Sequence, residues 1–574
     1  MRRKRGGTAR TLAGALALAA LVAGCRAERA PRGGGEGDTA SGPGGAPERG
    51  GIAVLAEPAD METPVPLAAR SPLDRELAGV MYMGLTRAAW RDGEVHWQTS
   101  NDTPMAAAYH WEYTGPDSTA IRFRMRGGLR WSDGHPLTAA DVVHTYRLLR
   151  DTTVAADLRA GVAEIDSVTA ENDSTVVIHY RRRYAEMLSA SAAAIVPRHV
   201  DARTSPGALR DSRAAAELVV SGPFRIAAWA RGDSIALVPN PSFSPKPFLD
   251  GIVIRITRDP NSAIAGLREG TVDVVRGVDP AQVPHLRSPD PRRPVRFERD
   301  RWRFREAIAY LPSAHPAFAD PAVRRALGMA LDVPGIIRAL GMQESATPAA
   351  GPYPARLKGL GDDPKIRPLP FDTAAADSIL AESGWRDGDG DGIRDRAGRA
   401  LSFVLTIDAG DPRAGDVARL VQRQWRAIGV AAETRRLDAE TFGDALARHA
   451  FQAALVGAEA RLTADLAAEW TPGAPLNFAR YADAETARLM DQARAQPTAE
   501  RAAPFWRAAA ERIVQEQPHT WLYDYDSIMA VSDRLRGVRP DPFGAYRNAW
   551  EWWIPRSRQP RAAPGTTDTA KGGR

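Results

Sequence analysis

Residues 123–143 read FRMRGGLRWSDGHPLTAADVV, and this stretch says more about the fold than any other part of the 574-residue chain. It continues an alternating pattern in which Ile121, Phe123 and Met125 are apolar and the residues between them are arginines. Such alternation is typical of a strand with one buried face. Gly127-Gly128 ends the pattern, so we expect a strand over 121–125 that stops at a loop.

The second half of the same stretch predicts a turn followed by a helix. Trp131 offers a large apolar surface, and Ser132-Asp133-Gly134 has the residue types of a tight turn. Thr138 and Asp141 are spaced as a capping box, which predicts a helix over 139–149. The stretch is therefore a structural corner between a strand and a helix, and it carries no catalytic signature.

Helix and strand signals alternate along the rest of the chain, which indicates an α/β fold. Asp320 and Asp372 stand at N-cap positions of two predicted helices. Apolar residues at helical spacing predict helices over 321–331, 373–383 and 417–428. Short apolar runs predict strands over 176–180, 235–238, 252–256, 401–407 and 451–456.

The order of the corner, a strand running into W-S-D-G, a proline turn and T-A-x-D-V, resembles the signature of the peptide- and nickel-binding family of bacterial extracellular solute-binding proteins, family 5. The resemblance continues in register through 221–226, 323–327 and 372–385, and it covers roughly residues 50–555. It implies a two-lobed periplasmic-binding-protein fold of type II, in its large form with an extra subdomain in the first lobe.

This resemblance also implies that the chain leaves the first lobe and later returns to it. We expect a lipoprotein signal peptide at 1–25, a flexible linker at 26–50, the first lobe at 51–85 and 176–258 with its extra subdomain at 86–175, the second lobe at 259–520, a return to the first lobe at 521–558, and a disordered tail at 559–574.

The first 25 residues resemble a bacterial lipoprotein signal. Five basic residues precede an apolar run that is too short to span a bilayer, and the run ends in Val22-Ala23-Gly24-Cys25. Cys25 is the only cysteine of the chain and stands where a lipobox would be acylated. A simple secretory signal and a short membrane anchor are the alternatives. We expect an exported lipoprotein, anchored to a membrane and facing the periplasm or the cell exterior.

Removal of this segment changes the charge of the protein. The whole chain carries +6 at pH 7, and residues 1–25 hold five basic and no acidic residues, which leaves +1. A nearly neutral protein lacks the electrostatic footprint of a nucleic-acid binder, so we expect no nucleic-acid partner. Once Cys25 is acylated, no thiol remains for a disulfide, a metal or a nucleophile.

The resemblance implies that the chain captures a short peptide or another small solute between its lobes and delivers it to ABC permease subunits, as a monomer without a cofactor. A sensor or scavenger without a transport role is one alternative. An exported hydrolase is another, but the sequence has no G-x-S-x-G, no zinc-protease motif and no phosphate-binding glycine loop. We therefore expect binding without chemistry.

The ligand site is predicted from a departure from the family pattern. Peptide-binding members carry a glycine, an aromatic residue and then an aspartate that pairs with the peptide amine. The matching stretch keeps Gly457 but has Arg461 where that aspartate would stand, with Glu459 and Asp465 as candidates to replace it. A guanidinium favours a carboxylate or phosphate, so Arg461 predicts an acidic group in the ligand; a plain surface residue is the alternative. We expect Gly457 to let the backbone approach the ligand, because a side chain there would crowd the cleft.

Aromatic side chains and possible metal ligands complete the candidates. Tyr353 is assigned to the ligand site as one of the aromatic residues that can line a cleft. The ten histidines show no H-x-H or other metal spacing, so we expect no nickel or zinc site made by the protein alone. Residues 387–395 resemble the start of a calcium loop, but Gly398 stands where an EF-hand needs a carboxylate, so a solvated acidic turn is the alternative. The candidate calcium ligands are Asp387, Asp389, Asp391 and Asp395.

Overall fold

Eleven strands hydrogen-bond into one sheet within Pro47–Arg574, the larger of the two units into which the chain divides. The computed structural model describes residues 46–69, 71–150, 154, 161–203, 217–286, 293–460 and 462–559. Along the sheet the strands follow the order β17 (Ala431–Leu437), β16 (Ser402–Asp408), β18 (Ala453–Glu459), β12 (Val295–Tyr310), β19 (His519–Ser532), β11 (Val274–Val275), β1 (Ile52–Glu57), β10 (Gly251–Ile256), β9 (Ser234–Pro239) and β8 (Phe224–Ala230), with β13 (Ala346–Pro348) paired to β19.

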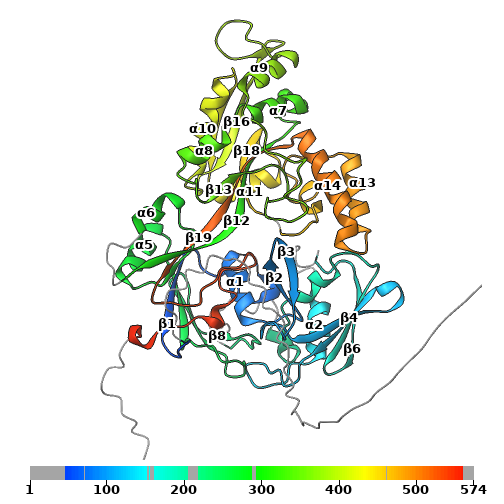
Figure 1. The fold of residues 1–574 in the computed structure, drawn as a ribbon, viewed down its shortest axis with the longest axis vertical. Helices are drawn as coiled ribbons and strands as arrows, with labels where there is room; N and C mark the ends of the chain where they lie inside the picture. The colour runs from blue at the N-terminus through cyan, green and yellow to red at the C-terminus, as the bar shows by residue number, and fades with distance from the viewer. Residues whose placement is uncertain are drawn as a thin grey trace, which may run out of the picture. The chain divides into compact units, whose positions relative to one another are not determined.

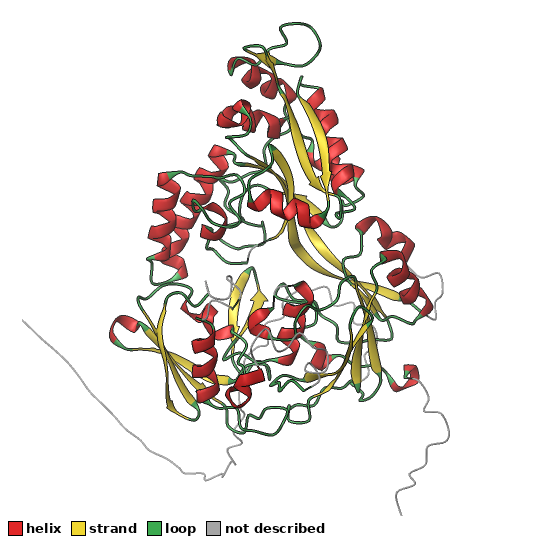
Figure 2. Cartoon of the chain, turned by 180° about the vertical axis from the view of Figure 1, so that it is seen from behind, coloured by secondary structure: helices red, strands yellow, loops and turns green. Residues whose placement is uncertain are grey.

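Two long antiparallel strands, β12 and β19, connect the two halves of this sheet (Figure 1). They span 16 and 14 residues, whereas the strands on either side have seven or fewer. Figure 2 shows the molecule from behind, with its strands in yellow and its helices in red. Their register shifts between Asp300 and Phe304 and again between Glu306 and Ala307. Such irregularities bend a ladder, and the first of them directly precedes the part of β12 that pairs with β18.

Separate apolar clusters fill the two halves, which gives the two-lobed α/β fold. On the side of β1 and β8–β10, one cluster is built around Phe224, Ile235 and Ile254. On the side of β16–β18, another is built around Phe403, Leu405 and Trp425. Strand β19 contributes to both, with Leu522 and Tyr523 in the second cluster and Met529 and Val531 in the first. The boundary expected at 520/521 therefore falls inside a strand that both lobes share.

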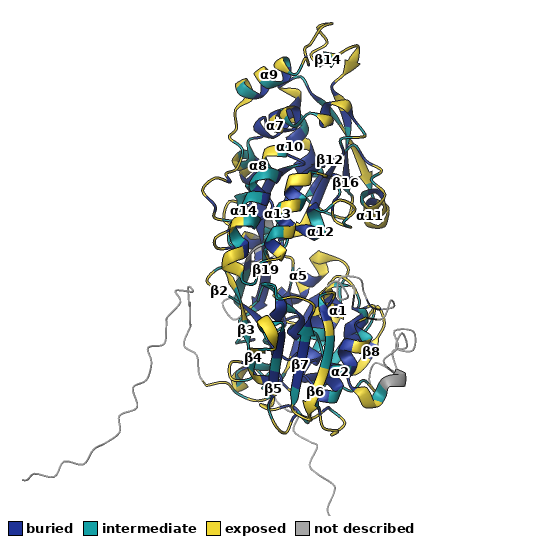
Figure 3. Cartoon of the chain, turned by 90° about the vertical axis from the view of Figure 1, so that its right-hand side faces the viewer, coloured by how far each residue is buried: buried dark blue, intermediate teal, exposed yellow. Residues whose placement is uncertain are grey.

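A separate four-stranded sheet carries the W-S-D-G corner. Its order is β4 (Ala108–Thr114), β5 (Ala120–Met125), β7 (Thr175–Tyr180) and β6 (Ile165–Asn172), and α2 (Ala139–Leu148) packs against β6 and β7. The boundary expected at 175/176 falls inside β7 of this sheet. In Figure 3 strands β5 and β7 are largely buried. A hairpin of β2 (Arg87–Arg91) and β3 (Glu94–Gln98) precedes the sheet.

The local predictions for the corner are confirmed. Trp131 is fully buried, Asp133 lies in a turn, and Thr138 N–H donates to the Asp141 carboxylate over 2.8 Å at the start of α2. The short range of these signals explains the success, because each depends on neighbours within a few residues.

Most of the other predicted elements are also confirmed, with shifted ends. Asp320 caps α7 and Asp372 caps α9, but α7 ends two residues before the predicted Leu331. The remaining helices and the short hairpin are α1 (Pro72–Met81), α5 (Pro260–Glu269), α6 (Val283–Leu286), α7 (Pro321–Met329), α8 (Val333–Ala339), α9 (Thr373–Glu382), α10 (Ala414–Arg426), α11 (Ala439–Ala447), α12 (Ala467–Trp470), α13 (Ala484–Arg494), α14 (Ala499–Glu516), and β14 (Asp395–Arg396) with β15 (Arg399–Ala400).

The shift that matters most for the site concerns β18. An apolar run predicts a strand over 451–456, but β18 begins at Ala453 and continues through Gly457, Ala458 and Glu459, which are exposed. Hydrophobicity does not mark this end of the strand. It is a strand because β12 pairs with it as far as Phe304↔Glu459.

Candidate ligand-binding site

The outer end of β18 has one unpaired edge. Strand β12 pairs with β18 along its whole length, whereas β16 pairs with it only at Leu405↔Ala453 and Thr406↔Ala454. Beyond Ala454, no strand in the described part of the chain pairs with β18 on the side away from β12. Unpaired strand edges expose N–H and C=O groups that can accept another extended chain.

The register decides which backbone groups face this edge. Leu311 N–H donates to Gln452 C=O and Ala460 N–H donates to Arg303 C=O, so the even-numbered residues between 452 and 460 bond to β12. The backbone groups of Gly457 and Glu459 therefore point to the free edge. Both residues are exposed, so these groups are accessible.

A buried carboxylate lies directly opposite Gly457. Glu306 of β12 is paired with Gly457 in the register, and its side chain is only 2% exposed. Burial raises the pKa of Glu306 to about 8, with Asp411 raising it further and Arg413 opposing the shift. Among the described residues Glu306 has no hydrogen-bond partner or ion pair within contact distance. At neutral pH it is therefore mainly a neutral acid that can donate a hydrogen bond, and it pairs with a cation only after it ionises.

Aromatic and charged side chains surround this carboxylate. Tyr523 is the β19 neighbour of Glu306, and its buried hydroxyl has no hydrogen-bond partner within the described residues. The Tyr525 ring lies 5.8 Å from the Tyr523 ring and carries the Arg413 guanidinium over its face at 4.3 Å. Arg413 Nε also lies 3.9 Å from the Asp411 carboxylate. The group combines an unpaired acid, an unpaired hydroxyl, a guanidinium and aromatic faces, which are the usual components of a small-molecule site.

The predicted ligand residues are placed in different environments. Glu459 lies on the exposed end of β18 and pairs with Arg303 Nη2 at 3.1 Å. Asp465 accepts a hydrogen bond from Ala467 N–H at the start of α12 and pairs with Arg494 at 2.7 Å. Tyr353 is 4% exposed in a core cluster, with its hydroxyl bonded to the Ala464 carbonyl. Arg461 lies outside the described residues, so its role stays a prediction.

The crowding expected at Gly457 concerns a bound ligand and stays a prediction, whereas the contacts of this position within the protein are ordinary. A Cβ at this position would lie 3.7 Å from Glu306 Oε2, which is an ordinary contact distance. A small side chain therefore does not crowd the backbone in this conformation. The glycine leaves no side chain on this face of β18 next to the buried Glu306 carboxylate. Sequence reasoning missed Glu306, because only the pairing of β12 with β18 brings the two residues together.

The acidic loop is held mainly by its own backbone. Asp387, Asp389 and Asp391 have carboxylate oxygens within 4.8 Å of one another. Their oxygens also accept from N–H groups of the same loop, and Asp395 accepts from Gly388 N–H. These bonds are those of a solvated turn, and calcium binding stays a hypothesis.

Membrane association cannot be traced to a helix in this structure. Within the ranges described, no helix is long and apolar enough to cross a bilayer. Cys25 and the apolar run before it lie outside those ranges.

Comparison with known proteins identifies the family to which this two-lobed fold belongs. Residues 103–469 match the model of the bacterial extracellular solute-binding proteins, family 5 (middle region). The chain belongs to this family.

Relatives cover most of the chain. Protein XP55 of Streptomyces lividans is 29% identical over 433 residues, which is 74% of this chain and 76% of that protein. The oligopeptide-binding protein AppA of Bacillus subtilis is 26% identical over 458 residues, or 76% and 81% of the two chains. The structure of that AppA with a nonapeptide superposes with a TM-score of 0.74 at 22% identity, over 89% of this chain and 100% of AppA. NikZ from Campylobacter jejuni in complex with Ni(L-His) gives 0.74 at 19% identity, over 88% and 99%.

Proposed function

We propose that this protein is the substrate-binding subunit of an ABC importer and that it captures a peptide or peptide-like solute between its lobes. Family membership supports the general role, and the names of the oligopeptide-binding relatives support the ligand class. The protein binds and releases its ligand without changing it. We propose that the lobes move relative to each other by bending of β12 and β19, where the register is irregular.

The observation that carries the peptide proposal is the free edge of β18 beside the Glu306 carboxylate. An extended peptide added at this edge would bond to the backbone of Gly457 and Glu459, irrespective of its side chains. An amino group at the end of that peptide would lie within reach of the carboxylate opposite Gly457. Backbone pairing and one charge pair together select a peptide with a free amine.

Glu306 gives the proposal a pH signature. With a pKa of about 8, Glu306 is mostly protonated at pH 7, and it must ionise to pair with an ammonium group. Binding should therefore release a proton, and affinity should rise by up to about tenfold per pH unit below 8. Above pH 8 the peptide amine itself deprotonates, so the rise should end there.

The test is to identify the co-purifying solute by native mass spectrometry and then to titrate short peptides by calorimetry. Glu306→Gln should weaken a free-amine peptide by about ten- to a hundredfold, the range expected for a hydrogen bond to a charged group. The same peptide with an acetylated amine should bind both proteins equally. Glu298→Gln, on the same strand but paired with Arg296, is the matched control and should bind like wild type. Equal affinity of wild type and Glu306→Gln for the free-amine peptide would rule out this assignment.

We also propose that the mature protein is tethered to a membrane through an acylated Cys25. Cys25→Ser removes the sulfur that would carry the acyl chains, so the protein should move from the membrane to the soluble fraction. Fractionation of cells followed by immunoblotting measures this directly. A Cys25→Ser protein that still sediments with membranes would point to a different anchor.

A further inference from the structure

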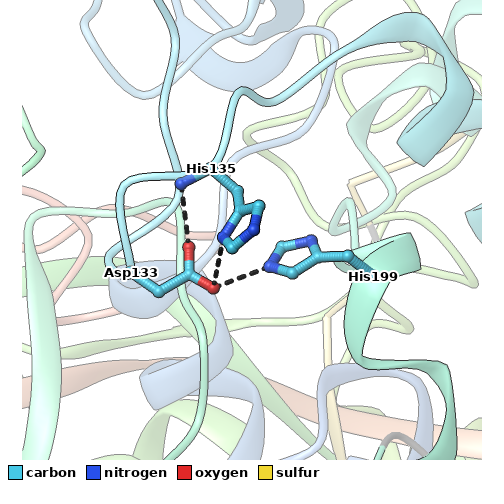
Figure 4. Close-up of side chains that lie close together, drawn as sticks. All are labelled: Asp133, His135 and His199. Atoms are coloured by element: carbon cyan, nitrogen blue, oxygen red, sulfur yellow. Dashed lines mark hydrogen bonds and ion pairs between the residues drawn. The ribbon is translucent and has the colours of Figure 1, made fainter.

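Asp133, His135 and His199 come together at the W-S-D-G corner, far along the chain from the β18 edge (Figure 4). Asp133 and His135 belong to the turn that follows Trp131. His199 belongs to the short helix η4 (Arg198–Arg203). The histidine spacing in the sequence gives no sign of this cluster, because 66 residues separate Asp133 from His199.

Both segments that carry the cluster are fixed in place. Trp131 is fully buried and its N–H donates to the His135 carbonyl over 2.9 Å, which closes the turn. Ser132 exchanges two hydrogen bonds with Val220, of 2.9 and 3.1 Å. On the other segment, Arg198 N–H donates over 2.9 Å to Asp141, the carboxylate that caps α2. The three side chains are therefore brought together by the fold and not by flexible loops alone.

A nitrogen of each imidazole ring lies close to the same oxygen of Asp133. His199 Nε2 lies 2.7 Å and His135 Nδ1 3.1 Å from Asp133 Oδ2. The other oxygen, Oδ1, accepts from His135 N–H, which orients the carboxylate. The two rings stack at 4.3 Å, so protonation of both would place two cations face to face. A single divalent ion could bridge these three donor atoms.

The electrostatics favour an ionised carboxylate at this point. His199 Nε2 lies within hydrogen-bond distance of this carboxylate and His135 N–H donates to it, and both contacts favour the ionised form. Arg130 adds a positive charge to the same turn, and its guanidinium donates a hydrogen bond to the Gly134 carbonyl at 2.8 Å. The side chains of Asp133 and His199 are 30% and 26% exposed, so solvent can complete the coordination of an ion.

We propose that Asp133 Oδ2, His135 Nδ1 and His199 Nε2 form a binding site for a late first-row divalent cation such as Zn²⁺. Zinc binds imidazole nitrogen and carboxylate oxygen at about 2.0–2.2 Å, which places tetrahedral donors about 3.3–3.6 Å apart. The two distances from Asp133 Oδ2 to the imidazole nitrogens, 2.7 and 3.1 Å, are shorter than this, so side-chain movements of under about 1 Å would admit the ion. Two nitrogens and one oxygen, with water in the fourth position, suit Zn²⁺, Ni²⁺ or Cu²⁺ better than Ca²⁺ or Mg²⁺. The bound ion would fasten the corner to η4.

The test uses the mature protein without an affinity tag and ZnCl₂ in calorimetry. Wild type should bind one zinc ion, and His199→Ala and Asp133→Asn should each weaken binding by at least about tenfold, since even outer-sphere partners contribute that much. His110→Ala, an exposed histidine on β4 of the same subdomain, and Asp389→Asn in the acidic loop should leave it unchanged. With Cu²⁺ as probe, electron paramagnetic resonance should show coupling to two imidazole nitrogens in wild type only.

Two results would overturn the assignment. One is the absence of saturable zinc binding to wild type, and the other is equal zinc affinity of wild type and His199→Ala. The peptide proposal is tested separately, because His199→Ala should bind the co-purified solute like wild type. The zinc site can thus fail while solute binding stands, and the reverse also holds.

Discussion

The W-S-D-G corner and the outer end of β18 differ in how their structure is specified. At the corner, an alternating strand, a turn and a capping box follow one another within residues 123–143, and each depends on its immediate neighbours. At β18, the important contact joins Gly457 to Glu306, which lies about 150 residues earlier in the chain. Local sequence specifies the first region, whereas strand register specifies the second.

The two regions also differ in burial, so changes in them should have different consequences. Trp131 is fully buried at the corner, whereas Gly457 is exposed at the end of β18. Changes at the corner should act on the stability of the fold, and changes at β18 should act on the affinity for the solute. Three substitutions test this separation.

The largest effect is expected from Trp131→Ala. The indole packs in the core of the first lobe, so its removal leaves a cavity and should reduce the free energy of unfolding by about 3–5 kcal/mol. Denaturant unfolding followed by circular dichroism measures the loss. Solute affinity of the protein that remains folded should stay at the wild-type value.

Trp131→Phe should reduce the free energy of unfolding by less. The indole N–H is buried without a hydrogen-bond partner within the described residues, so replacing it with Phe sacrifices volume but no hydrogen bond. It should therefore cost much less than Trp131→Ala. If the alanine variant unfolds at the same denaturant concentration as wild type, the corner does not have the structural role assigned to it.

The next effect concerns Glu306 and links stability to pH. Burial raises its pKa from 4.5 to about 8, so the folded protein holds the proton more tightly than the unfolded chain. The resulting stabilisation is fully present below about pH 4.5 and is lost as pH rises through 8. Glu306→Gln stays neutral, so between pH 5 and 8 it should lose about 2–4 kcal/mol less stability than wild type.

Comparison of the two proteins removes contributions from other groups. Burial lowers the pKa of His519 to about 3, so the stability linked to His519 is present above about pH 6.5 and falls at lower pH in wild type and variant alike. The measurement is the difference in unfolding free energy between the proteins across pH 5 to 8. Parallel pH profiles would mean that Glu306 is ionised in the folded protein.

The same distinction explains what could be predicted from the sequence. The α/β class, the family, the corner and the caps at Asp320 and Asp372 follow from local patterns. The pairing of Glu306 with Gly457 does not, because no local signal sets the register of β12 against β18. The cluster of His135 and His199 was missed for the same reason. Asp465 has a plausible charge for the site, but the Ala467 N–H and Arg494 engage its carboxylate.

The smallest of the three effects, and the most specific one, is expected at Gly457. A Cβ at this position would make an ordinary contact with Glu306, so Gly457→Ala should be tolerated in both stability and affinity. Gly457→Leu adds a branched side chain on the Glu306 face, where it should block the approach of a peptide amine to this buried carboxylate. It should weaken a free-amine peptide by about tenfold, equivalent to about 1.4 kcal/mol, with little change in unfolding free energy. Calorimetry and denaturant unfolding of the same preparations measure the two quantities. A leucine variant that binds like the alanine variant would show that the peptide amine does not reach Glu306 past residue 457, and the ligand would then have to lie elsewhere on the lobe.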